Sequence, residues 1–182
     1  MSNAEIISIG TELLLGQIVD TNATWLAQRL TGIGVNVFYK TIVGDNPKRM
    51  KEVIQGALKR SDVVITGGGL GPTQDDLTRE IISESTGRKL VLDPMLLQQI
   101  EQRFRRRGLI MTSNNERQAF IPEGAIPVLN PNGTAPSFIV ECPQGIIFAL
   151  PGVPFELKWL FENEVVPYLQ RKLQISEVIT YK

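Results

Sequence analysis

The most constraining feature of this chain is an unbroken apolar strand that runs directly into a glycine cluster. Residues 62–66 read Asp-Val-Val-Ile-Thr, and residues 67–71 read Gly-Gly-Gly-Leu-Gly. A short run of β-branched residues is typical of a strand that is covered on both faces in a parallel sheet. The glycine cluster then forms the loop at the carboxyl end of that strand, where open α/β sheets bind their ligands.

Strand-like and helix-like segments alternate before and after this point. Residues 4–9 and 35–43 are β-prone, and the segments from Thr21 and from Pro47 carry apolar residues at helical spacing. Pro94 opens a further helix, with Asp93 as its N-cap. Alternation of this kind predicts a layered α/β fold with right-handed crossovers.

Prolines divide the second half of the chain into short pieces around two predicted strands, 138–142 and 146–150. The Pro-Gln-Gly between them predicts a tight hairpin turn. A last helix is expected from Pro154, with a kink or restart at Pro167. We expect one domain over residues 1–173 and a tail over 174–182 that is a linker or the start of a further domain.

The residue types that are missing narrow the chemistry. The sequence has no histidine and one cysteine, which excludes histidine-based catalysis, intrachain disulfides and zinc sites built on imidazole or thiolate. A metal would have oxygen ligands, which favours a hard ion such as Mg2+ or Mn2+. Lys and Arg total 19, as do Asp and Glu, so no net field draws the chain to nucleic acid or to an anionic membrane. Because no apolar run reaches the length of a membrane span, and Glu5 stands where a signal peptide needs a basic start, we expect a soluble, cytoplasmic protein.

The strongest local signal is the segment 66–78, Thr-Gly-Gly-Gly-Leu-Gly-Pro-Thr-Gln-Asp-Asp-Leu-Thr. Glycines let main-chain N–H groups approach a phosphate, and the start of the following helix adds partial positive charge, so we predict an anion-binding loop. It is not a Walker A loop, because no Lys-Ser/Thr pair closes it, and Pro72 replaces the last glycine of a G-x-G-x-x-G match. The alternative is an ordinary turn in which Asp75 or Asp76 caps the helix.

Two adjacent carboxylates beside an anion site call for a cation. Asp75 and Asp76 repel each other and a bound phosphate unless a positive ion lies between them. We therefore interpret both as ligands of a divalent ion that bridges to a phosphate, and as acids that orient or deprotonate a water.

Polar groups also follow the first two strands. In the loop 10–22, Thr11, Glu12, Asp20 and Asn22 are candidates for binding ligand hydroxyls or a metal, and residues 13–15, all leucine, are expected to contact a neighbouring subunit or to close the site. Asp20 has the alternative role of N-cap of the next helix, and Asp45, after the second strand, has the same two interpretations.

Four motifs in order along the chain resemble a known family. They are residues 9–16 with 20–22, residues 68–73 with 75–78, Asn130 with 133–136, and residues 150–154 with Glu156 and Lys158. In these motifs the chain resembles the amino-terminal domain of the CinA family, competence/damage-inducible protein A, within the wider group of molybdopterin-binding domains such as MogA and MoaB. The resemblance covers residues 4–173 and implies a three-layer α/β/α sandwich with a mostly parallel sheet.

The resemblance also implies a function and a site. In the molybdenum-cofactor branch the glycine loop binds the pterin phosphate, and the two functional acids correspond to Asp45 and Asp76. The CinA branch is associated with metal-dependent hydrolysis of ADP-ribose to AMP and ribose 5-phosphate. The Gly-Pro-Thr sequence at 71–73 and the two adjacent aspartates at 75–76 resemble that branch. Ser137 stands where the family pattern has glycine, and its side chain is expected to narrow the pocket.

The predicted site thus has three sets of residues. The catalytic set is Asp45, Asp75 and Asp76, and the set for Mg2+, Mn2+ or Co2+ is Glu12, Asp20, Asp75 and Asp76. The set for substrate and phosphate is Gly10, Thr11, Glu12, Asn22, Gly67, Gly68, Gly69, Gly71, Thr73, Gly133, Thr134, Pro151 and Gly152.

The leading hypothesis is a metal-dependent nucleotide pyrophosphatase that acts on ADP-ribose. The first alternative is a non-catalytic module that binds molybdopterin or a nucleotide, and the second is a scaffold that dimerises through residues 13–15. The expected partners are a small nucleotide or pterin and further copies of the chain, in a dimer or a trimer, with neither nucleic acid nor membrane among them.

Overall fold

The computed structural model describes residues 2–174. Its strands are β1 (Asn3–Ile9), β2 (Asn36–Val43), β3 (Val63–Gly67), β4 (Leu90–Leu92), β5 (Phe120–Pro122), β6 (Ile126–Val128), β7 (Ser137–Cys142) and β8 (Gly145–Leu150). Its helices are α1 (Thr11–Leu14), α2 (Thr21–Gly32), α3 (Pro47–Leu58), α4 (Thr78–Ser85), α5 (Pro94–Arg106), α6 (Ser113–Glu116), α7 (Pro154–Leu160) and α8 (Val166–Leu173). A 3-10 turn covers Arg117–Ala119, and a π-helical segment, Phe161–Val165, joins α7 to α8.

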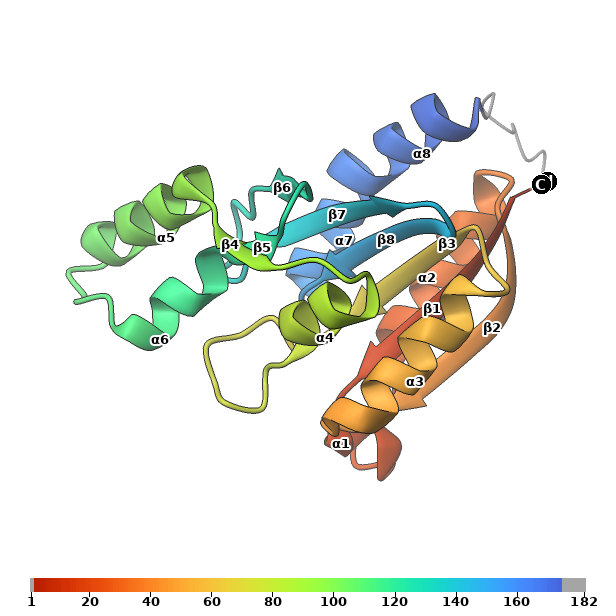
Figure 1. The fold of residues 1–182 in the computed structure, drawn as a ribbon, viewed down its shortest axis with the longest axis horizontal. Coiled ribbons are helices and arrows are strands. Elements are labelled where there is room, and N and C mark those ends of the chain that lie inside the picture. The colour runs from red at the N-terminus through yellow and green to blue at the C-terminus, as the bar shows by residue number, and fades with distance from the viewer. Residues whose placement is uncertain (1, 175–182) are drawn as a thin grey trace.

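The strands form one large sheet and one small pair. The large sheet has six strands in the order β2-β1-β3-β8-β7-β6, and β4 pairs separately with β5 (Figure 1). Strands β2, β1, β3 and β8 are parallel to one another, whereas β7 pairs antiparallel with both β8 and β6. The mostly parallel sheet is therefore confirmed, and the loops that follow the four parallel strands meet at one edge.

Helices cover both faces of the large sheet. Helices α2, α7 and α8 pack on one face, and α3, α4 and α5 pack on the other (Figure 1). In β3, Val63 and Ile65 belong to the first core and Val64 to the second, and all three are fully buried. Because successive side chains of a strand point to opposite faces, burial on both sides explains the unbroken apolar run. The predicted three-layer α/β/α sandwich is confirmed.

Local signals placed several element ends correctly. The Asp93 carboxylate accepts a hydrogen bond of 2.9 Å from the Leu96 amide at the start of α5, as its N-cap role requires. Cys142 pairs with Gly145 across the predicted hairpin turn. The chain adopts π-helical geometry just before Pro167, which lacks the N–H that a regular helix needs there.

Other parts of the fold were not predicted. Helix α1 lies within the expected loop 10–22, and the short elements β4, α6, β5 and β6 have no counterpart among the predicted segments. Helix α8 ends at Leu173, where the domain is expected to end, and the expectation for the tail falls outside the described residues beyond Gln174. Within residues 2–174, no helix has both the length and the apolar character needed to cross a membrane.

Candidate functional site

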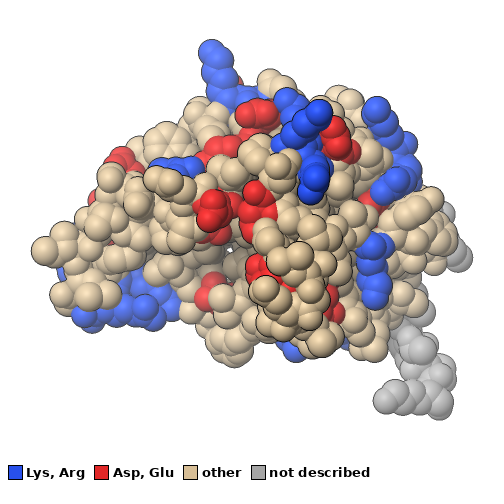
Figure 2. Space-filling model, turned by 90° about the horizontal axis from the view of Figure 1, so that it is seen from below, with Lys and Arg blue, Asp and Glu red and all other residues tan. Residues whose placement is uncertain are grey.

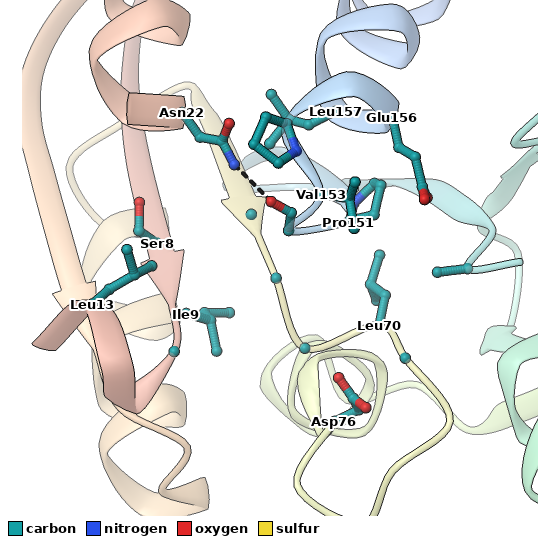
Figure 3. A pocket seen from close by; sticks show the side chains of 18 of the residues that line it. Ser8, Ile9, Leu13, Asn22, Leu70, Asp76, Pro151, Val153, Glu156 and Leu157 are labelled. Carbon is teal, nitrogen blue, oxygen red and sulfur yellow. Dashed lines mark hydrogen bonds between the residues drawn. The ribbon is translucent and has the colours of Figure 1, made fainter. Parts of the chain in front are cut away.

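An open cavity of about 570 Å³ lies at the edge of the sheet where the parallel strands end (Figure 3). Its wall takes residues from the loops after all four parallel strands, including Glu12 after β1, Asp45 after β2, Gly69 after β3 and Gly152 after β8. Small-molecule sites are commonly roughly 300–1,000 Å³ in volume. The cavity therefore has the location that the strand ends predicted and the size of a ligand site.

Most of the predicted site residues border this cavity. Those in the wall are Gly10, Glu12, Asp20, Asn22, Asp45, Gly67, Gly68, Gly69, Gly71, Thr73, Asp75, Asp76, Thr134, Pro151 and Gly152. Two predicted residues lie outside it. Thr11 is bonded to Asp45, and Gly133 packs against the Glu156 carboxylate, which would lie only 1.8 Å from a Cβ atom at that position.

Asp76 is held against its own loop at the cavity wall. Its Oδ2 accepts hydrogen bonds from the Thr73 amide at 2.9 Å and from the Thr73 hydroxyl at 2.5 Å. A Cβ atom on Gly71 would lie 2.5 Å from the same oxygen, so the carboxylate depends on glycine there. Leu77 is the N-cap residue of α4, and no side chain bonds to that helix end. The helix-cap alternative for Asp75 or Asp76 was therefore wrong.

Two further predicted acids have structural partners. Asp20 accepts a hydrogen bond of 2.9 Å from the Ala23 amide, which confirms its alternative role as the N-cap of α2. Asp45 accepts from the Thr11 amide at 2.9 Å and from the Thr11 hydroxyl at 2.8 Å. The N-cap of α3 is Asn46, so the capping alternative for Asp45 was wrong. Asp45 instead ties the loop after β2 to helix α1.

The predicted four-carboxylate metal set is not assembled. Among residues 2–174, no three Asp, Glu, Cys or His side chains gather into a group that could hold a metal ion. In this set Asp20 caps α2, and Asp76 accepts hydrogen bonds from Thr73 through one of its two carboxylate oxygens, Oδ2. Mg2+ in proteins is usually held by one or two carboxylates together with waters and substrate phosphates. The wall therefore fits an ion whose coordination the ligand completes, but not an ion held by the protein alone.

The charged side chains of the cavity wall are acidic. Six carboxylates line it, from Glu12, Asp20, Asp45, Asp75, Asp76 and Glu156, whereas no lysine or arginine of the described residues does. Figure 2 shows acidic side chains gathered around a hollow on this face of the molecule. Like charges in a cleft repel an incoming anion, so this wall disfavours an anion whose charge is not neutralised.

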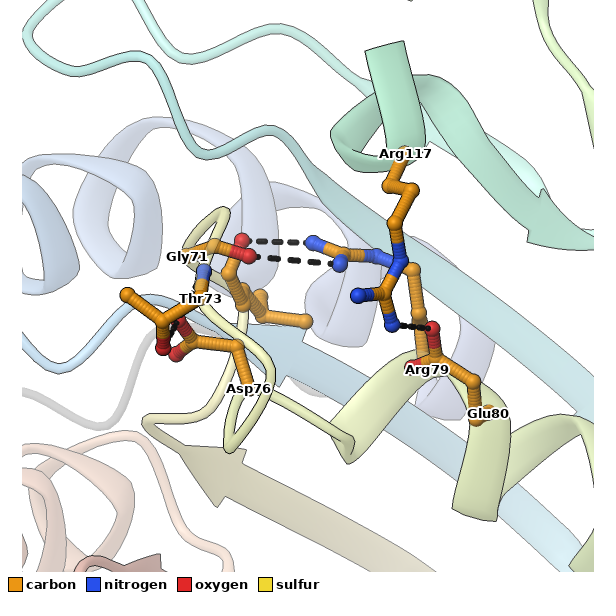
Figure 4. A network of polar contacts seen from close by, with 7 residues as sticks. Gly71, Thr73, Asp76, Arg79, Glu80 and Arg117 are labelled. Atoms are coloured by element: carbon orange, nitrogen blue, oxygen red, sulfur yellow. Dashed lines mark hydrogen bonds and ion pairs between the residues drawn. The ribbon is translucent and has the colours of Figure 1, made fainter. Parts of the chain in front are cut away.

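In the glycine loop after β3, the main-chain N–H groups of residues 69–71 make no hydrogen bond within the described chain. The carbonyls of Gly68 and Gly69 accept from the hydroxyl and the amide of Thr78, at 2.8 and 3.1 Å. The Leu70 carbonyl accepts from Arg79 Nη2 at 2.5 Å (Figure 4). In a trans peptide the N–H points opposite to the carbonyl, so the amides of residues 69, 70 and 71 face away from α4.

None of these three amides finds an acceptor within residues 2–174. Successive main-chain N–H groups that include a left-handed residue form a concavity suited to anions, and Gly69 has φ +69°. The predicted anion-binding loop thus has three free donors at the cavity wall.

Two glycines let the strand ends approach closely. Gly68 has φ +110°, and a Cβ atom there would lie 2.4 Å from the Ile9 carbonyl oxygen at the end of β1. A Cβ atom on Gly152 would lie 3.4 Å from Gly68 Cα. The ends of β1, β3 and β8 therefore meet around Gly68. The side-chain Nδ2 of Asn22 donates a hydrogen bond of 2.8 Å to the Gly152 carbonyl (Figure 3).

The predicted site omitted Glu156, although it lies in the fourth motif. Its side chain extends from the start of α7 toward the cavity, on the side opposite Asp76 (Figure 3). Its Oε2 accepts from Asn130 Nδ2 at 2.7 Å, and Asn130 is fully buried. The Asn130 side-chain oxygen also accepts from the amides of Asn132 and Gly133, so this asparagine orients both the loop and the acid.

Two other missed residues carry no motif of their own. Gln118 lines the cavity, is 1% exposed, and donates to the Leu70 carbonyl at 3.3 Å, while its Oε1 has no partner in the described chain. Arg79 lies behind the glycine loop and is also 1% exposed. Burial lowers the pKa of Arg79, and the nearby Glu80 and Asp76 carboxylates oppose that shift.

The expectation for Ser137 was wrong. Its side chain is buried within β7 and does not reach the cavity wall. Of the three leucines in 13–15, Leu13 lines the cavity, whereas Leu14 and Leu15 are 49% and 65% exposed.

The described chain thus has a mostly parallel α/β sheet with a glycine loop and an acidic cavity at the edge where the parallel strands end. The family model described as "Probable molybdopterin binding domain" matches residues 5–171. MoaB of Thermus thermophilus has the same fold, with a TM-score of 0.67 and 21% identity over 96% of this chain and 95% of that one.

More similar proteins carry the name CinA or competence-damage inducible protein. The CinA protein of Thermoplasma acidophilum, described as of unknown function, is 33% identical with a TM-score of 0.84 over 94% of this chain and 98% of that one. A competence-damage inducible protein of Halothermothrix orenii is 54% identical over 93% of this chain and 41% of its own length. That of Bacillus subtilis is 49% identical over 97% of this chain and 42% of its own length.

The chain belongs to the CinA family of molybdopterin-binding domains. It spans about two fifths of the length of these curated relatives.

Proposed function

We propose that this domain is a metal-dependent nucleotide pyrophosphatase that hydrolyses ADP-ribose to AMP and ribose 5-phosphate. The observation that carries the proposal is the pairing of three free loop amides with a cavity wall of six carboxylates and, among the described residues, no basic side chain. The amides favour a phosphate, and the carboxylates tolerate a diphosphate only when a divalent ion neutralises it.

Each part of the wall has a role in this proposal. The amides of residues 69–71 donate to phosphate oxygens and orient the diphosphate. Asp76, oriented by Thr73, and the neighbouring Asp75 would hold the ion together with the substrate's own oxygens. When bound, a divalent ion neutralises the charge that develops on the phosphoryl group and lowers the pKa of a water.

The acid on the opposite wall, Glu156, fits proton transfer. Glu156, held by the buried Asn130, faces the cavity and is a candidate to accept the proton of the attacking water. The water's oxygen forms a bond to one phosphorus, the bridging P–O bond breaks, and the bridging oxygen leaves on the other phosphate. The balance is ADP-ribose plus water giving AMP plus ribose 5-phosphate.

A product assay tests the proposal. We expect the chain incubated with ADP-ribose and Mg2+, Mn2+ or Co2+ to release AMP and ribose 5-phosphate in equal amounts, measured by ion-exchange chromatography. Addition of excess EDTA is expected to stop product formation, since the carboxylate wall then faces an unneutralised diphosphate. Continued release of AMP in EDTA would exclude the metal-dependent mechanism.

A non-catalytic binding module is the second candidate. It is favoured by the same three amides, which bind a phosphate equally well when no water is activated, and by membership of a molybdopterin-binding family. Calorimetric titration with ADP-ribose and with molybdopterin, followed by chromatography of the ligand, separates the two candidates. Saturable binding with the ligand recovered intact would support the module.

A further inference from the structure

We propose that Arg79 is a positioning residue that places its positive charge behind the anion-binding loop and acts through the loop's peptide groups. The inference rests on the proposed function only in taking the ligand to be a phosphate-bearing anion. Arg79 is absent from the cavity wall, and nothing in the motifs that predicted the site pointed to it.

The buried Arg79 side chain has no carboxylate paired with it among the described residues. Arg79 is 1% exposed, and none of the ion pairs between described residues includes it. Arginine is almost never fully buried unless its charge is paired. Here the guanidinium is instead bound by main chain, with Nη2 2.5 Å from the Leu70 oxygen and Nη1 3.4 Å from the Gly71 oxygen (Figure 4).

The neighbouring acids do not neutralise Arg79 directly. Glu80 is paired with Arg117 at 2.8 Å, and Asp76 is bound by Thr73 (Figure 4). The charge on Arg79 is therefore directed at the two carbonyls of the glycine loop.

The peptide group between residues 70 and 71 links this charge to the cavity. Its carbonyl binds Arg79, and its N–H, on Gly71, points the opposite way and has no acceptor within the described chain. A hydrogen bond from a charged donor polarises the amide and makes its N–H a stronger donor on the other side. Because no lysine or arginine of residues 2–174 lines the wall, this is a route by which an arginine's charge reaches a bound anion.

Variants of Arg79 test the proposal with inorganic pyrophosphate and Mg2+ as the probe. Arg79→Met removes both the charge and the donors, whereas Arg79→Lys keeps the charge. We expect Arg79→Met to weaken pyrophosphate binding by about tenfold or more, and Arg79→Lys by less than about threefold, in calorimetric titrations of the full chain. The amide NMR signals of Gly69, Leu70 and Gly71 should shift on titration in the wild type and require more pyrophosphate in Arg79→Met.

Arg88→Met is the matched control. Arg88 also donates to two main-chain carbonyls, those of Glu123 and Glu141, but it does not line the cavity or touch the glycine loop. It is expected to bind pyrophosphate as the wild type does. Should Arg79→Met fail to fold in thermal unfolding, Arg79→Gln replaces it, since glutamine keeps a donor without the charge.

Three results would overturn the inference: wild-type affinity in Arg79→Met or its substitute, equal weakening in the lysine and uncharged variants at unchanged stability, or no binding of pyrophosphate to the wild type. Binding is measured without turnover. A chain that binds pyrophosphate with the expected Arg79 dependence but leaves ADP-ribose intact therefore contradicts the pyrophosphatase proposal and supports the inference.

Discussion

Asp76→Asn is expected to lower the rate of AMP release from ADP-ribose by about 100-fold, which corresponds to roughly 2.7 kcal/mol of transition-state stabilisation. Asparagine keeps a side-chain oxygen that accepts from both the amide and the hydroxyl of Thr73, so the turn at residues 73–76 is retained. What is lost is one negative charge at the point where the glycine loop meets the acidic wall. Steady-state kinetics at saturating Mg2+ measure the effect.

Asp93→Asn is the control for this substitution. Asp93 likewise accepts a hydrogen bond from a main-chain amide, that of Leu96, but it lies outside the cavity wall. We expect it to keep wild-type turnover, and both variants to unfold within about 1 kcal/mol of the wild type. Full activity in Asp76→Asn would show that the aspartate serves only to shape the turn.

Gly68→Ala is expected to have the largest effect on stability, lowering the free energy of unfolding by about 3 kcal/mol or more. Two causes act together. The backbone at φ +110° is strained for any residue with a Cβ atom, and that atom would lie 2.4 Å from the Ile9 carbonyl oxygen. Urea unfolding followed by circular dichroism provides the measurement.

Gly56→Ala gives the opposite prediction. Gly56 lies inside α3, and a Cβ atom there would meet nothing within 4 Å. The substitution removes a flexible residue from a helix, so it should raise the free energy of unfolding by about 0.5–1 kcal/mol.

If Gly68→Ala unfolded at the same urea concentration as the wild type, the close approach of β1 and β3 described here would be wrong.

The parts of the fold that the sequence predicted are those with regular local patterns. The double-sided burial of β3 produces its continuous apolar run, and Pro47 and Pro94 mark helix starts. The short strands β4, β5 and β6 have three residues each, too few for a periodic pattern. Their pairing depends on contacts between distant segments, such as Leu90 with Pro122, which local patterns do not encode.

The sequence predicted where the candidate site lies, at the carboxyl edge of the sheet, but not the hydrogen bonds among its residues. Residue types and loop positions located Asp20, Asp45 and Asp76 near one another, whereas their hydrogen-bond partners decide what each does. Asp20 has a backbone amide three residues away as its partner, and local spacing left that role as an even alternative. The burial of Gln118 and Arg79 against Leu70 arises from tertiary packing and leaves no signal in the sequence.

The most direct measurement is a calorimetric titration of the chain with the α,β-methylene analogue of ADP-ribose, whose P–C–P bridge cannot be hydrolysed, once with Mg2+ and once with EDTA. An acidic wall that admits a diphosphate only with a cation predicts binding at least about tenfold tighter in Mg2+. Equal affinity in Mg2+ and in EDTA would contradict it.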